Sequence, residues 1–179
     1  MFVGSPLRIT AGIIFTMLLL WACASDIRSR RIPNPIVMAL GLGGIAFSVL
    51  TTAVGEGLVR GLSGSATGLA IWLPFWLLGM IGAGDVKLFA AAGGWLGPWG
   101  AVQGALAAAL LGGVLTVGWL VWERGLAHTA RGLVLWWASR GATGARSPRL
   151  VAEPRHSVPY GVALALGVSL VAWLPGFGR

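Results

Sequence analysis

Two aspartates stand out in this chain, because each lies where a long apolar run meets a short polar one. The sequence has only five Asp and Glu residues among 179. Asp26 follows the apolar run 7–25, and Asp85 follows two glycines in the stretch "MIGAGDVKLF". An ionisable group at membrane depth costs so much free energy that it is a functional hypothesis by default. The other reading is that each Asp only caps a helix or pairs with a nearby basic residue.

Two carboxylates brought together in a site of low dielectric can catalyse peptide hydrolysis. They do not both ionise easily, so such a pair shares one proton. The ionised carboxylate takes a proton from the attacking water, and the protonated one donates to the carbonyl oxygen and then to the leaving nitrogen. This is aspartic-protease chemistry, which needs no metal or other cofactor. The pair titrates as a unit, so neither Asp26 nor Asp85 is assigned as the acid or the base.

The glycines before Asp85 have a physical role in this chemistry. Gly82 and Gly84 can adopt φ values closed to other residues, and they allow another backbone to approach closely. We therefore expect them to let a substrate come near the Asp85 carboxylate as an extended strand. The G-x-G-D pattern is weak evidence by itself, because the chain contains 29 glycines.

The composition places the elements that position these residues in a membrane. The chain is 56% hydrophobic and 10% charged, with a mean hydropathy of +0.83. A soluble domain of this size could not cover its surface with so little charge. The net charge of +8 does not indicate nucleic-acid binding, because the basic residues follow the ends of apolar segments instead of forming one face with aromatic residues. Cys23 is the only cysteine, so we expect neither a disulfide framework nor a cysteine-based metal site.

Six apolar segments are candidates for membrane crossings, which need roughly 20 residues each. We therefore predict an all-α, polytopic membrane protein with about six transmembrane helices. One of the six candidates is short, with only twelve residues. The segments are 7–25, 32–54, 62–81, 88–99, 101–122 and 157–175.

The basic residues predict the orientation of these helices. If the loops 26–31 and 123–157 are both cytoplasmic, the N-terminus is outside, and Asp26 and Asp85 lie at the same membrane face. The basic segment 123–157 is either a solvated loop or includes an amphipathic helix in the membrane interface. We expect a single integral-membrane domain over residues 1–179, with 123–157 as a basic cytoplasmic loop within it.

Three motifs in this order resemble the type IV prepilin peptidase family, which are GxGD-type intramembrane aspartyl proteases. They are "DIRSRRIPNPI" after the first span, "GAGDVKLFAAAGGWLG" after the third, and "VPYG" opening the last. The resemblance implies that Asp26 and Asp85 are the catalytic residues. It also implies a set of residues that shape the active site, namely Gly82, Gly84, Lys87, Pro33, Asn34, Pro159, Tyr160 and Gly161. Of these, Asn34 and Tyr160 either form hydrogen bonds near the aspartates or only end their helices.

The chain also differs from the larger, bifunctional members of this family. Those members carry an N-terminal hydrophobic segment and a cytoplasmic loop with paired cysteines, which are associated with methylation of the new N-terminus. Here only six residues precede the first span, and Cys23 is alone. The chain thus resembles the short, peptidase-only members, and we expect no N-methyltransferase activity.

These expectations describe a multi-pass endopeptidase of the bacterial inner membrane. It would cut a prepilin or pseudopilin at the cytoplasmic face, between a short basic leader and the apolar helix of the pilin. The resemblance implies that the scissile bond follows a glycine. The expected partners are this substrate and the lipid bilayer, with no nucleic acid, metal or other cofactor. The alternatives are a small proton-coupled transporter or channel subunit, in which Asp26 and Asp85 relay protons, and an assembly factor without catalysis.

Overall fold

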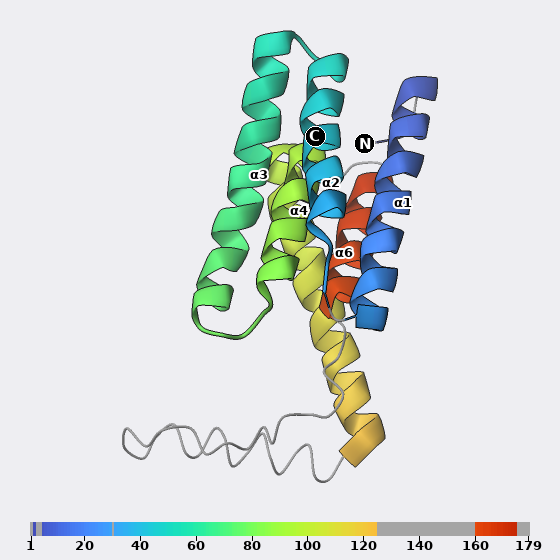
Figure 1. Cartoon of the computed structure of the whole chain (residues 1–179), viewed down its shortest axis with the longest axis vertical. Coiled ribbons are helices and arrows are strands. Elements are labelled where there is room, and N and C mark those ends of the chain that lie inside the picture. Colours follow the sequence, from blue (N-terminus) through green and yellow to red (C-terminus); the bar gives the residue numbers. More distant parts are fainter. Residues whose placement is uncertain (1, 3–4, 30, 125–159, 175–179) are drawn as a thin grey trace. The chain divides into compact units, whose positions relative to one another are not determined.

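The computed structural model describes Phe2 and residues 5–29, 31–124 and 160–174. Within these residues the regular structure is entirely helical, as the composition predicts (Figure 1). The basic segment 123–157 lies almost wholly outside the described residues. The described helices are α1 (Pro6–Ser29), α2 (Asn34–Thr51), α3 (Val54–Leu77), α4 (Ala83–Arg124) and α6 (Tyr160–Trp173).

The chain forms two compact units, residues 1–112 with 159–179 and residues 113–158. Every contact discussed below lies in the first unit. There α2 packs against both α3 and α1, and α1 also packs against α6. A single peptidase domain over residues 1–179 remains a prediction.

The helices have the length and surface of membrane spans. Three of them are long and apolar enough to cross a bilayer, over residues 6–29, 34–51 and 83–118. Large apolar side chains such as Trp21, Leu42 and Leu110 are more than 60% exposed, as side chains in contact with lipid are. The chain is therefore a polytopic all-α membrane protein. The number of crossings and the outside position of the N-terminus remain predictions.

Helix α4 consists of two helical segments that meet at Gly97. This residue has φ 73° and ψ 176°, a conformation that favours glycine, and Pro98 follows it. The second segment folds back along the first. Its Gly104 lies beside the first segment, since a Cβ atom there would be 3.3 Å from Leu96 and 3.7 Å from Phe89. The first segment therefore covers 83–96, not the predicted 88–99. It is about 21 Å long, which is still shorter than a hydrocarbon core of roughly 30 Å.

Helix α3 begins earlier than the sequence predicted. Residues 55–61, expected as a polar link before a span at 62–81, belong to this helix, which ends at Leu77. They are helical because Gly57 and Gly61 are buried against α2, where a Cβ atom on Gly57 would lie 2.6 Å from the carbonyl oxygen of Ser48. Glu56 is exposed, whereas the side chain of Arg60 lies against Gly97 of α4, where a Cβ atom would come within 2.8 Å of the Arg60 Nε.

Glycines also let α3 and the first segment of α4 approach each other closely. A Cβ atom on Gly64 would lie 2.8 Å from the Cα atom of Gly97, and one on Gly68 would lie 3.0 Å from the carbonyl oxygen of Phe89. Small residues that permit backbone contact are a recurring means of helix association in lipid. This packing holds segment 83–96, which carries Asp85 in its first turn, against α3.

Candidate active site

The two aspartates lie on different helices and face the same point. Asp26 is in the last turn of α1, and Asp85 is in the first turn of α4. Both are half-buried. A Cβ atom built on Gly161 would lie 2.9 Å from Oδ2 of Asp26 and 3.4 Å from Oδ1 of Asp85. Both aspartates thus lie at the same end of the helices, and their expected position at one membrane face remains a prediction.

Gly161 contributes the space between the two carboxylates. It is buried in the first turn of α6, and its carbonyl oxygen accepts a hydrogen bond from the thiol of Cys23, with sulfur and oxygen 3.6 Å apart. Cys23 precedes Asp26 by about one helical turn on α1. Any side chain at position 161 would therefore meet the Asp26 carboxylate. The position of the two carboxylates therefore depends on the absence of a Cβ atom at position 161.

Two serines hold the chain between α1 and α2 against the end of α1. Ser25 donates a hydrogen bond to the carbonyl oxygen of Arg31 at 3.0 Å, and Ser29 donates to the same oxygen at 3.3 Å. Helix α2 then begins at Asn34, with the carbonyl of Pro33 accepting from the backbone N–H of Ile36 at 3.1 Å. This folding brings the start of α2 to the same end of the bundle as the aspartates.

A cleft of about 330 Å³ opens at the two aspartates. It receives side chains of both charges from the α1–α2 connection, from the start of α2 and from the start of α4. The residues that line it are Asp26, Arg31, Ile32, Asn34, Val37, Gly82, Ala83, Gly84, Asp85 and Lys87. Six of them are residues that the sequence singled out.

The glycines before Asp85 act by their small size and not by an unusual backbone. The carbonyl of Gly82 accepts from the backbone N–H of Asp85 at 3.2 Å, which begins α4. A Cβ atom on Gly82 would lie 3.3 Å from Oδ2 of Asp85, and one on Gly84 would lie 3.6 Å from Ile32. The described glycines with positive φ are Gly79 and Gly97. Gly82 and Gly84 therefore do not use the φ freedom of glycine in this structure, since the turn after α3 is made at Gly79, and the close approach of a substrate beside them remains a prediction.

The other predicted residues have more varied positions. Asn34 begins α2 and also lines the cleft, and a hydrogen bond from it near the aspartates remains a prediction. Pro33 is the N-cap of α2 and is not among the lining residues of the cleft. Tyr160 is the first residue of α6, but its side chain lies outside the described part, as does Pro159.

Sequence reasoning did not identify the residues that support the site. Cys23 was used only to argue against a disulfide framework and a cysteine-based metal site, and no role was predicted for Ser25, Ser29, Ile32 or Val37. The spacing of the two serines is one usable signal, because residues four apart lie on one face of a helix. The contact between Cys23 and Gly161 joins residues far apart in the chain and leaves no local pattern.

The arrangement is suited to acid–base chemistry on a bound amide. Two carboxylates face one point beside a cleft, and both come from the ends of rigid helices. Among the described residues, no group of three or more His, Cys, Asp and Glu side chains is placed to hold a metal ion. One carboxylate can then activate a water while the other donates a proton to the group under attack.

Both aspartates lie within the part of the chain that matches a known protein family. The chain matches the model of the "Type IV leader peptidase family" over residues 13–117, which include both Asp26 and Asp85. It is 33% identical over 108 residues to a prepilin leader peptidase/N-methyltransferase of Dickeya chrysanthemi, and 32% identical over 102 residues to one of Klebsiella pneumoniae. A protein of the same name from Pectobacterium carotovorum is 31% identical over 145 residues.

These matches cover more of this chain than of the relatives. They include 56%, 52% and 74% of this chain, but 36%, 42% and 50% of the respective relatives. The chain thus spans half or less of the length of these curated relatives. No solved structure matches the chain significantly.

Proposed function

Because the chain belongs to the type IV leader peptidase family, we propose that it is a membrane-embedded aspartic endopeptidase that removes the leader peptide from type IV prepilins or pseudopilins. Asp26 and Asp85 are its catalytic pair. The observation that carries this proposal is the convergence of both carboxylates on Gly161. The names of the curated relatives support the substrate class.

In the proposed mechanism the pair holds one proton when the substrate binds. The ionised carboxylate removes a proton from a water, which attacks the carbonyl carbon of the scissile peptide bond. The protonated carboxylate donates to the carbonyl oxygen, and the proton gained from water later passes to the leaving nitrogen. Fixing two carboxylates on helix ends holds this geometry before the substrate arrives. No metal or other cofactor takes part.

The remaining cleft residues position the substrate. Gly82 and Gly84 leave room for its backbone beside Asp85, while Asn34 offers hydrogen-bonding groups from the start of α2. Lys87 supplies a positive charge at the rim, where its exposed side chain can contact anionic headgroups. Pro33 and Gly161 shape the same end of the helices, and the family resemblance assigns a shaping role to Pro159 and Tyr160 as well.

Cleavage takes place at the cytoplasmic face of the bacterial inner membrane. Arg28 and Arg31 lie at the same helix ends as the two aspartates, and the positive-inside rule assigns such an end to the cytoplasm. The substrate is cut after a glycine, between its basic leader and its apolar helix. The protein releases a pilin with a free, unmethylated N-terminus, and mass spectrometry of the processed pilin tests this last point.

Co-expression with a prepilin tests the function. Asp26→Asn and Asp85→Asn should each reduce leader removal at least about 100-fold, because each replacement removes a group that transfers protons. Glu56→Gln is the matched control, since Glu56 is an exposed acidic residue in the first turn of α3. It should process prepilin as the wild type does.

The same variants distinguish the protease from the transporter alternative. If both Asn variants still remove the leader, the protease proposal is wrong. A transporter would leave prepilin uncut in the wild type and would show a proton flux that depends on the two aspartates. An assembly factor would show neither activity.

A further inference from the structure

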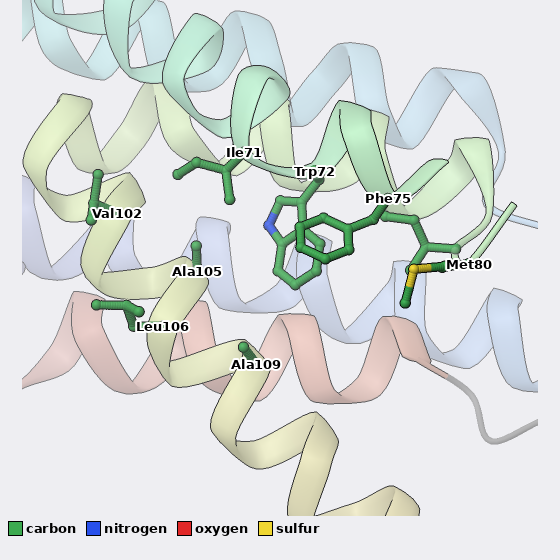
Figure 2. A pocket seen from close by; sticks show the side chains of 9 residues that line it. Ile71, Trp72, Phe75, Met80, Val102, Ala105, Leu106 and Ala109 are labelled. Atoms are coloured by element: carbon green, nitrogen blue, oxygen red, sulfur yellow. The ribbon is translucent and has the colours of Figure 1, made fainter. Parts of the chain in front are cut away.

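A second cavity lies next to the cleft and has a different character. It is an apolar groove of about 520 Å³ between α3 and the second segment of α4. Figure 2 shows Ile71, Trp72 and Phe75 on the α3 side, facing Ala105, Leu106 and Ala109 on the α4 side. All of its lining residues are apolar, apart from the indole nitrogen of Trp72.

The groove and the cleft meet at one turn of the chain. Ile81 lines the groove, and the next residue, Gly82, lines the cleft that contains the two aspartates. A molecule that fills the groove and continues past this turn therefore enters the cleft beside Asp85. With the two cavities adjacent at this turn, the apolar groove suits an apolar part of a substrate and the cleft a polar part.

The wall of the groove is connected rigidly to the helix that carries Asp85. The ring of Trp72 packs edge-on against the ring of Phe89, with centroids 5.6 Å apart, and Phe89 follows Asp85 by about one turn of α4. The backbone at Phe89 in turn touches Gly68 of α3. A ligand held by Trp72 and Phe75 is thereby held at a defined position relative to the Asp85 carboxylate.

The α4 side of the groove favours a helix as its occupant. Ala105 and Ala109 lie four residues apart, so both face the groove from successive turns. Such small residues allow a second helix to come close in a membrane, where association depends on packing because lipid chains are as apolar as the side chains. A peptide segment in this position must also be helical, because its backbone groups find no partners in lipid.

We propose that this groove is the docking site for the apolar transmembrane helix of the substrate, on the side of the scissile bond that remains in the mature pilin. The inference rests on the proposed function, because it assigns the groove to the same substrate. The helix lies between α3 and the second segment of α4. Its first residues pass the turn at Ile81 and Gly82 and place the scissile bond in the cleft.

Filling the groove tests the proposal kinetically. Ala109→Trp places a large side chain in the groove, and Ala70→Trp is the matched control, since Ala70 is an exposed alanine of α3 that does not line it. With a prepilin that the wild type processes, Ala109→Trp should raise KM by about tenfold, a loss of about 1.4 kcal/mol in binding. Ala70→Trp should leave KM unchanged. A truncated substrate without the apolar helix should be cut equally by all three proteins.

Photocrosslinking provides a test that does not depend on activity. A benzoylphenylalanine at position 109, in the Asp85→Asn background to retain the substrate, should crosslink to the apolar segment of co-expressed prepilin, whereas the same residue at position 70 should not. Crosslinks to lipid alone, or an equal KM in Ala109→Trp and Ala70→Trp, would overturn the docking proposal while leaving the peptidase intact. A wild type that does not cut prepilin would overturn both proposals.

Discussion

Oδ2 of Asp26 lies 2.9 Å from the position that a Cβ atom would occupy on Gly161. No Cβ atom fits at that distance without moving the carboxylate, and the same position lies 3.4 Å from Oδ1 of Asp85. The end of α1 and the starts of α4 and α6 therefore depend on one another at a single residue without a side chain.

Gly161→Ala should nearly abolish activity while leaving the protein folded. Its methyl group would displace Asp26 by a fraction of an ångström to an ångström, a scale at which misplacement costs about 100-fold in rate. The measurement is the rate of leader removal by the purified variant. Gly55→Ala is the control, because nothing lies within 4 Å of a Cβ atom there. Wild-type activity in a folded Gly161→Ala protein would show that the two carboxylates do not need this spacing.

The two glycines before Asp85 should differ from each other in their sensitivity. Gly82→Ala should slow leader removal moderately, because its Cβ atom would lie 3.3 Å from Oδ2 of Asp85, a tight contact that a small shift relieves. Gly84→Ala should slow leader removal less than Gly82→Ala, because 3.6 Å from Ile32 is ordinary van der Waals contact and only the room for the substrate backbone is reduced. Measuring the rate of leader removal for both variants in parallel shows which substitution does more damage. A Gly84→Ala variant as damaged as Gly161→Ala would contradict this prediction.

Ser25→Ala should weaken substrate binding more than the chemical step. It removes the hydrogen bond to the carbonyl of Arg31, which contributes about 1 kcal/mol to holding the α1–α2 connection. Because Arg31 and Ile32 line the cleft, KM should rise several-fold while kcat changes little, and Ser25→Thr should restore KM. Ser63→Ala is the control, since the hydroxyl of Ser63 bonds within its own helix to Val59. Equal kinetics for Ser25→Ala and Ser63→Ala would argue against a positioning role.

Gly64→Ala should destabilise the fold by about 1–3 kcal/mol, the usual effect of adding a methyl group to a tightly packed contact. The added atom would lie 2.8 Å from the Cα atom of Gly97, where the two segments of α4 meet. Denaturant unfolding in detergent micelles measures the change. Gly55→Ala, with open space around its Cβ position in the same helix, should be neutral or slightly stabilising. Unchanged stability in Gly64→Ala would mean that α3 and α4 can separate at little cost.

The sequence predicted the general position of the aspartates because the signal for it is local. Apolar runs long enough to cross a membrane alternate with short polar stretches. This pattern predicts the helices, and it also predicts which helix ends lie at the same side of the bundle. Asp26 and Asp85 therefore appear at the same end of the bundle in both the prediction and the structure. The prediction placed Asp85 in a loop between spans, whereas it lies in the first turn of α4.

The errors occurred where packing overrides local polarity. Glu56 and Arg60 make residues 55–61 look like a link, but Gly57 and Gly61 bury one face of the stretch against α2 and keep it helical. Pro98 indicates from the sequence that α4 is interrupted. The direction of the second segment, which folds back along the first, depends on contacts such as that of Gly104 with Phe89, and these are not visible in the sequence. The contact of Gly161 with Asp26 joins opposite ends of the chain, so only the folded structure reveals its distance.

The central claim is that Asp26 and Asp85 act as one catalytic unit, and a double-mutant cycle tests it most directly. The rate of prepilin leader removal is measured for Asp26→Asn, for Asp85→Asn and for the variant with both substitutions. Residues that act together give non-additive losses. We predict that the double variant is no slower than the slower single variant. Losses that multiply, or a single variant that processes prepilin at the wild-type rate, would contradict the claim.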